Sequence, residues 1–125
     1  ESRKLPKKER LGSHLIVDII RADFSVLNDK DLINAFFDSC LDTYNLIQIK
    51  RDSHQFTPYG ITMFALLSTS HISIHTWPEK GTACLDIFTC SDFKFENNRI
   101  YDIKNIIRRF FHTDHIIVKN VDREF

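Results

Sequence analysis

Alternating side chains near the start of the chain predict a strand. The segment from Leu11 to Ala22 is rich in β-branched residues. Two sets of positions alternate along it, one holding Leu15, Val17 and Ile19, the other holding His14, Ile16, Asp18 and Ile20. Because the second set also contains isoleucines, we expect both faces of this strand to be covered.

Four further strands follow from β-branched, apolar content between turn residues. They are expected at residues 46–56, Ile61–Ser68, Thr82–Thr89 and His115–Val121. Pro58-Tyr59-Gly60 and the residues from Pro78 to Gly81 carry the turn chemistry between them. A strand over Thr82–Thr89 would place Cys84, Asp86, Phe88 and Cys90 on one face.

Apolar residues recurring every three or four positions predict two helices. The first stripe contains Ile33, Phe36, Phe37, Cys40, Leu41 and Tyr44, and the second contains Ile100, Ile103, Ile107, Phe110 and Phe111. Asn28 is expected to cap the first helix, and Asn97 or Asn98 to open the second. The position of Cys40 on the stripe predicts a core cysteine.

This order of elements predicts an α+β fold, a two-layer sandwich with a mainly antiparallel sheet and two helices on one face. Its single domain is expected at residues 11–125, after a flexible basic tail at residues 1–10. The sheet face without helices needs a cover, since strands such as Leu15–Ile20 are apolar on both sides. A homodimer that pairs two such faces is therefore expected.

The composition argues against several classes of binding partner. Seventeen basic and seventeen acidic side chains balance, so no overall field attracts nucleic acid or an anionic membrane. The longest apolar run is five residues, Met63–Leu67, far short of a membrane span. Cys40, Cys84 and Cys90 lack paired metal-ligand spacing, which predicts no metal site and favours a reducing cytoplasm.

A chemical cluster occupies the middle of the chain. Within about twenty residues it gathers Ser70, His75, Glu79 and Cys90, which could act as nucleophile, proton carrier, carboxylate and second acid. Each alone would more often be an ordinary strand or core residue. On a regular strand Ser70 and His75 would face opposite sides, so a bulge, turn or break near Ser70 is expected to bring them together.

The segment from Thr69 to Cys90 resembles the self-processing region of prokaryotic S-adenosylmethionine decarboxylases. The family pattern is Glu-Ser-His-x-x-Ile-His-Thr-(Trp/Tyr)-Pro-Glu, followed by Asp-(Val/Leu/Ile)-Phe-Thr-Cys-Gly. This chain departs from it at Thr69, where the family has glutamate, and at Ser91, where it has glycine. Leu11-Gly12-x-His14-Leu15 and Phe56-x-Pro58-Tyr59-Gly60 extend the resemblance.

The resemblance implies a cofactor made from the backbone. Ser70 would attack the carbonyl of Thr69, and β-elimination would cut the chain between them and leave a pyruvoyl group on the second piece. His75 matches the residue that transfers protons in processing, and Thr62 falls where the family carries an assisting hydroxyl. Cys90 matches the proton donor for the decarboxylated substrate.

The implied reaction is decarboxylation of S-adenosylmethionine, which supplies the aminopropyl donor for spermidine. Phe56 matches an aromatic that stacks on adenine, and Glu79 a carboxylate that holds the ribose. Trp77 could line the pocket or simply pack. The family also forms dimers whose sites draw on both chains.

Two alternatives remain open. One is a related pyruvoyl decarboxylase that acts on arginine or ornithine, which Phe56 and Glu79 oppose because those substrates carry no adenosine. The other is a processing-dead homologue with a regulatory role, for which Thr69 is the support.

Overall fold

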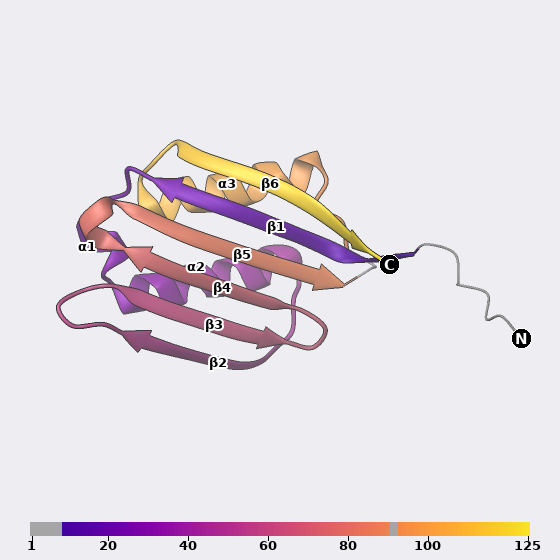
Figure 1. The fold of residues 1–125 in the computed structure, drawn as a ribbon, viewed down its shortest axis with the longest axis horizontal. Coiled ribbons are helices and arrows are strands. Elements are labelled where there is room, and N and C mark those ends of the chain that lie inside the picture. Colours follow the sequence, from indigo (N-terminus) through magenta and orange to yellow (C-terminus); the bar gives the residue numbers. More distant parts are fainter. Residues whose placement is uncertain (1–8, 91–92) are drawn as a thin grey trace, which may run out of the picture.

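The computed structural model describes residues 9–90 and 93–125 of the chain. Within them six strands form one antiparallel sheet in the order β2-β3-β4-β5-β1-β6 (Figure 1). The strands are β1 (Arg10–Ile20), β2 (Gln48–Gln55), β3 (Ile61–Leu67), β4 (His71–Trp77), β5 (Thr82–Cys90) and β6 (His115–Glu124).

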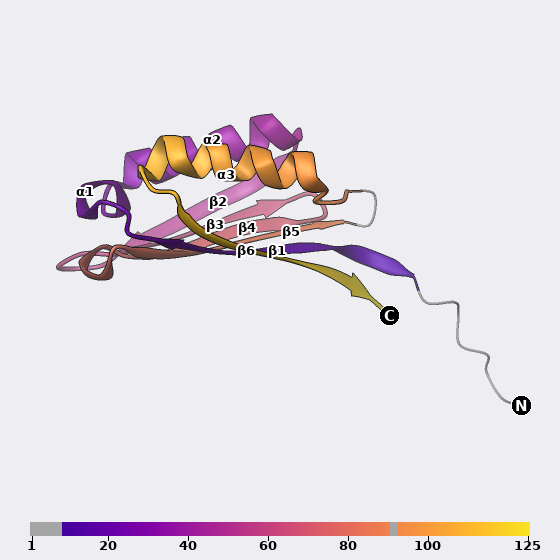
Figure 2. The same ribbon diagram turned by 90° about the horizontal axis from the view of Figure 1, so that it is seen from above.

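The helices α1 (Phe24–Leu27), α2 (Lys30–Tyr44) and α3 (Asn97–Phe111) lie on one side of this sheet, as Figure 2 shows. The two long ones are α2 and α3, and short ones are α1 and the 3₁₀ turn η1 (Pro78–Lys80). The predicted α+β two-layer sandwich is therefore confirmed. The cap at the start of α2 lies one residue later than expected. Asp29, and not Asn28, accepts a hydrogen bond from the Leu32 amide at 3.1 Å.

The core lies between the sheet and the two long helices. Leu15, Val17 and Ile19 of β1 are fully buried, and burial of such side chains stabilises the fold by about 1.5–3 kcal/mol each. From the helices, Phe36 and Phe111 meet edge to face with ring centroids 5.0 Å apart. Cys40, also fully buried, confirms its expected place in the core.

The opposite side of the sheet carries no helix in the part of the chain that is described, and we call it the open face. The register of the strands determines which side chains are neighbours on this face. His75 pairs with Thr62 on β3 and with Cys84 on β5. The ring of His71 stacks between those of Phe64 and Phe88, at centroid distances of 5.6 and 5.7 Å. Mixed aromatic, charged and half-exposed apolar side chains therefore share this face.

Further details differ from the sequence expectations. β1 starts at Arg10, inside the range expected for the tail, whereas α3 opens at Asn97, as expected, with Glu96 at its cap position. Residues 1–8 of the expected tail and Ser91 lie outside the described residues. None of the helices in the described part combines the length and the apolar character that a bilayer crossing needs.

Candidate active site

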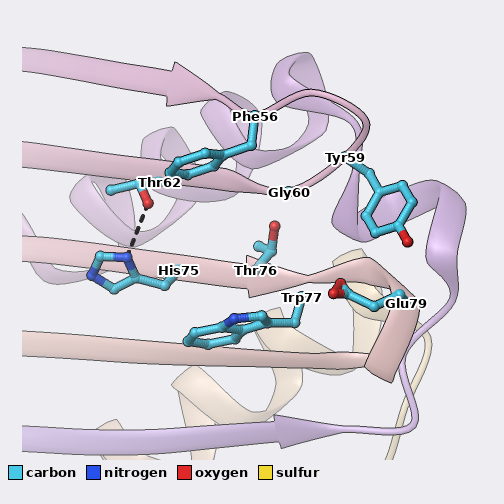
Figure 3. Close-up of a pocket in the computed structure, with 8 residues that line it drawn as sticks. All are labelled: Phe56, Tyr59, Gly60, Thr62, His75, Thr76, Trp77 and Glu79. Carbon is cyan, nitrogen blue, oxygen red and sulfur yellow. Dashed lines mark hydrogen bonds between the residues drawn. The ribbon is translucent and has the colours of Figure 1, made fainter.

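The β2–β3 connection forms one wall of a pocket at one end of the sheet. Its backbone closes through a 2.8 Å hydrogen bond from the Phe56 amide to the Gly60 carbonyl. The pocket has a volume of about 300 Å³, and we call it the loop pocket (Figure 3). It is lined by Phe56, Tyr59, Gly60, Thr62, His75, Thr76, Trp77 and Glu79.

The residues of the loop pocket are arranged around an open centre. Figure 3 shows the rings of Phe56 and Trp77 along its two sides, with His75 at one end and Glu79 at the other. The Phe56 side chain is 49% exposed and that of Trp77 is 39% exposed. Two half-exposed aromatic faces with a carboxylate at one end can take a flat, cationic or hydroxyl-bearing ligand.

His75 is held by its cross-strand neighbour. The distance from His75 Nδ1 to the Thr62 hydroxyl oxygen is 3.0 Å, and the two residues are directly opposite in the β3–β4 register. A hydrogen bond at Nδ1 fixes the ring orientation and leaves Nε2 to exchange a proton with a substrate. The predicted partnership of these two residues is thus present in the geometry.

Glu79 is placed by a tight turn after β4. Pro78 starts η1 and Gly81 ends it with a φ of +60°, a conformation that glycine adopts without strain. A Cβ at Gly81 would also lie 3.1 Å from the carbonyl oxygen of Ala22. The turn therefore returns the chain into β5 and leaves the Glu79 carboxylate at the pocket.

A second pocket lies where β3 turns into β4. The Leu67 amide donates to the Ser70 carbonyl over 3.0 Å, so Ser68 and Thr69 form the tip of a two-residue turn. The pocket beside it, which we call the turn pocket, has a volume of about 240 Å³. Its lining comprises Tyr44, Asn45, Leu46, Ile47, Leu67, Ser68, Thr69, Ser70, Thr89, Cys90 and Phe93.

The lining of the turn pocket combines a hydroxyl and a thiol with two aromatic rings, those of Tyr44 and Phe93, which we call the aromatic wall. Ser70 is buried, Thr69 is exposed and Cys90 is partly buried. Tyr44 and Phe93 meet edge to face at 5.6 Å, and the Tyr44 hydroxyl donates to the Arg99 carbonyl at 2.6 Å. Burial raises the pKa of Tyr44 well above its usual value, so this residue stays a neutral wall.

The structure divides the predicted site residues between the two pockets. Phe56, Thr62, His75, Trp77 and Glu79 lie at the loop pocket, whereas Thr69, Ser70 and Cys90 lie at the turn pocket.

A turn near Ser70 is present, as expected, but it does not bring Ser70 to His75. The turn at Ser68 and Thr69 ends before β4, and β4 then pairs in continuous register with β3 and β5. Five residues of strand span about 17 Å, and the odd spacing puts the two side chains on opposite faces. Within one chain the two residues are kept apart.

Several pocket residues were not found from the sequence. Tyr59, Gly60 and Thr76 lie inside the matched motifs, which was the available signal, but no role was assigned to them. Tyr44 and Phe93 line the turn pocket. No signal marked Tyr44, because an aromatic on an apolar stripe is the ordinary pattern of a core residue, and none marked Phe93, which lies in the loop between β5 and α3.

Ionisable groups on the open face lie between the two pockets. His14 Nε2 is 3.0 Å from the Asp86 carboxylate, and the Cys84 thiol lies 3.7 Å from the Asp18 carboxylate as a donor. Burial, and then the carboxylate of Asp18, raise the pKa of Cys84. This supports the structural role expected for Cys84, since a protonated thiol is a weak nucleophile.

Comparison with known proteins defines the class and then the family. The arrangement is an α+β enzyme fold with its motif residues in two pockets along one strand. Residues 13–124 match the family model described as S-adenosylmethionine decarboxylase. The chain belongs to this family, which confirms the resemblance seen in its sequence and makes it a member of an enzyme family.

Individual relatives agree with that assignment. The S-adenosylmethionine decarboxylase proenzyme of Sulfurihydrogenibium sp. (strain YO3AOP1) is 39% identical over 83 residues, 66% of this chain and 62% of that protein. The proenzyme of Methanococcus vannielii is 33% identical over 100 residues, 80% of this chain and 82% of that protein. The crystal structure of the adenosylmethionine decarboxylase from Aquifex aeolicus VF5 superimposes with a TM-score of 0.77 at 30% identity, covering 92% of both chains.

Proposed function

We propose that this chain cuts itself between Thr69 and Ser70 and then decarboxylates S-adenosylmethionine. The observation that carries the proposal is the placement of the family motif: Ser70 and Cys90 share the turn pocket, while Phe56, His75 and Glu79 share the loop pocket. One pocket holds the bond-making groups and the other holds groups suited to a nucleoside.

The geometry of the turn supports self-cleavage. The bond to be cut lies at the tip of a two-residue turn, where the backbone is accessible, and the Thr69 side chain points to solvent. The β-branched Thr69 that replaces the family's glutamate is therefore not packed into the core. Attack of the Ser70 hydroxyl on the Thr69 carbonyl converts the amide to an ester, and β-elimination releases the Thr69 carboxylate. Hydrolysis of the resulting enamine releases ammonia and leaves the pyruvoyl group.

The residues around Ser70 fit such a group. The pocket offers the Thr89 hydroxyl and the Cys90 thiol beside a small apolar wall. When formed, a pyruvoyl carbonyl supplies an electron sink for loss of CO₂ from an amine substrate. Cys90 then returns a proton to the substrate carbon, and the aromatic wall of Tyr44 and Phe93 limits access of water from the helix layer.

The loop pocket supports recognition of an adenosyl substrate. Phe56 and Trp77 offer faces for adenine and for the sulfonium cation, and Glu79 offers two acceptor oxygens for ribose hydroxyls. Arginine and ornithine carry neither the adenine nor the ribose that Phe56 and Glu79 would bind in this proposal. The regulatory alternative has no support beyond the replacement of the family's glutamate by Thr69, an exposed residue at the tip of the turn.

A homodimer with shared sites is part of this proposal. Ser70 and His75 lie at opposite ends of β4 and on opposite faces, so His75 cannot serve the Ser70 of its own chain without moving the strand. A second copy facing the open face would bring its loop pocket to the turn pocket of the first. A two-fold pairing would bring together a turn pocket and a loop pocket for both copies at once.

Cellular placement completes the proposal. The product would serve as the aminopropyl donor for spermidine, and the protein would act in the cytoplasm. Three free thiols, at Cys40, Cys84 and Cys90, support a reducing compartment.

Intact-mass measurement tests the proposal most directly. The purified protein should contain two chains, residues 1–69 and residues 70–125, the second blocked at its amino end. Ser70→Ala should stay uncut. Release of labelled CO₂ from S-adenosylmethionine, arginine and ornithine should then favour S-adenosylmethionine. A chain that stays whole after long incubation would establish the regulatory alternative instead.

A further inference from the structure

One residue outside the pocket is hydrogen-bonded to both ends of the loop that carries Phe56 and Tyr59. Asn28 ends α1, and its side-chain oxygen accepts a hydrogen bond from the Gly60 amide at 2.9 Å. Its backbone carbonyl accepts another from the Gln55 side chain at 3.1 Å. Asn28 is not among the residues that line the loop pocket, so it touches the loop and not the ligand space.

The same segment also reaches the other walls of the pocket. The Ala22 amide donates to the Gly81 carbonyl at 3.0 Å, which ties it to the turn that carries Glu79. The Leu27 carbonyl accepts from the buried Thr76 hydroxyl at 2.8 Å. We call residues 22–28 the α1 brace, because it connects the aromatic loop, β4 and the Glu79 turn.

The α1 brace also contacts an aromatic residue of the loop pocket. Phe24 packs edge to face against Tyr59 at a centroid distance of 5.3 Å. The Ile61 amide donates to the Thr76 hydroxyl oxygen at 2.9 Å, which holds the far end of the loop independently of Asn28. The Gly60 amide is held by one side-chain atom, the Asn28 oxygen, in addition to these contacts.

We propose that Asn28 is a positioning residue for nucleoside recognition. Its side-chain oxygen holds Gly60, and through it the rings of Phe56 and Tyr59, at a fixed spacing from Glu79. Gly60 has a φ of +109°, a conformation that glycine adopts readily and that other residues rarely reach. Recognition by two separate walls depends on their spacing to about half an ångström. The inference deepens the proposed function and rests on it.

Three substitutions separate the acceptor from the shape of the side chain. Asn28→Ala removes the acceptor, Asn28→Leu removes it while keeping the size, and Asn28→Asp keeps an oxygen in place to accept from Gly60. Asn98→Ala, an exposed asparagine on α3, serves as the matched control. The probe is 5′-methylthioadenosine, whose binding is measured by titration calorimetry on the purified protein without turnover.

The acceptor should matter to binding and not to chemistry. Asn28→Ala and Asn28→Leu should weaken probe binding, and raise KM for S-adenosylmethionine, by roughly threefold to tenfold, the range for one lost hydrogen bond. Turnover at saturation and the extent of chain cleavage should stay near those of the unmodified protein. Asn28→Asp should restore probe affinity to within about twofold, and Asn98→Ala should leave it unchanged.

The other outcomes overturn the inference in distinguishable ways. Unchanged affinity in Asn28→Ala and Asn28→Leu would refute it. Equal weakening in Asn28→Asp would refute the role of the acceptor, and a parallel loss of cleavage, turnover and thermal stability would assign Asn28 to folding alone. Failure of the unmodified protein to bind the probe would instead refute the proposed function, and the inference with it. Should Asn28→Ala fail to fold, the comparison of Asn28→Leu with Asn28→Asp decides the question.

Discussion

The two pockets at the ends of β4 differ in what they expose. The turn pocket has a buried serine and a partly buried thiol, with Tyr44 of α2 in its lining. The loop pocket has half-exposed aromatic rings and a carboxylate, joined to the open face. β4 begins just after the turn pocket and ends at the loop pocket, and its regular pleat prevents the two pockets from meeting in a single chain. The contrast teaches that a complete set of motif residues in sequence need not be a complete site in one chain.

The largest effect is expected from mixing chains that are damaged in different pockets. When differently tagged Ser70→Ala and His75→Ala chains are co-expressed, one site of the mixed dimer should combine an intact Ser70 with an intact His75. The His75→Ala chain should then be cut, although it stays largely whole when expressed alone. Affinity capture through both tags, followed by intact-mass measurement, reports the cleavage.

A pair damaged in the same pocket is the matched control for that experiment. Ser70→Ala with Cys90→Ala should not restore decarboxylation, because both residues come from the turn pocket of one chain. Rescue by this pair but not by the first would contradict the proposed division between chains. If light scattering showed a monomer and that monomer were fully active, the shared site would be contradicted altogether.

Substitution of Cys90 should separate two steps that use the same pocket. Cys90→Ala is expected to leave chain cleavage largely intact and to remove most decarboxylation, because the thiol acts on the substrate carbon and not on the backbone. Cys84→Ala is the control, since Cys84 lies on the same face of β5 but against Asp18. Labelled CO₂ release and intact mass are measured on both variants, and equal loss of the two activities in Cys90→Ala would disprove the separation.

A smaller effect is expected from the carboxylate of the loop pocket. Glu79→Gln should weaken binding of S-adenosylmethionine about tenfold or more, since hydrogen bonds to a charged group contribute on the order of 1.5–3 kcal/mol each. Chain cleavage should continue. Glu96→Gln, at an exposed position before α3, is the control, and KM from initial rates is the measurement. A similar KM in both variants would remove Glu79 from the recognition scheme.

The smallest effect concerns the open face between the pockets. Burial among aromatic rings, and then the charge of His14, lower the pKa of His71, while Asp86 opposes the shift. The unfolded chain therefore takes up the proton first, and the free energy of unfolding should fall as the pH drops below about 6.5 toward the lower native pKa. Urea unfolding at about pH 8 and about pH 5.5 should show a weaker pH dependence in His71→Phe, which keeps the stacked ring. An identical pH dependence would show that other groups dominate.

Periodicity was enough to predict the layers, because alternation and the three-to-four spacing report directly on which side of each element is buried. It could not choose between adjacent capping residues. Asn28 and Asp29 both have suitable side chains, and the structure uses Asp29 for α2 and leaves Asn28 to the Gly60 amide. The choice depends on a loop 32 residues further along the chain, which local pattern does not contain.

The candidate site was predicted in its members but not in their arrangement. The parity of Ser70 and His75 correctly implied opposite faces, whereas the assumption that they meet in one chain required a break that is absent from β4. Motif matching names residues that act together without stating which chain supplies each one. The contributions of Tyr44 and Phe93 stayed hidden because Tyr44 comes from α2 and Phe93 from the loop before α3.

The strand order has a consequence for the mature protein. A cut between Thr69 and Ser70 would put β1, β2 and β3 in one piece and β4, β5 and β6 in the other, yet β1 lies between β5 and β6 and β3 lies beside β4 (Figure 1). The two pieces would be interleaved within one sheet, so neither could leave without breaking three antiparallel ladders. Cleavage after folding would therefore produce a stable complex of two polypeptides, because each piece alone would keep only one two-stranded ladder, β2–β3 or β4–β5.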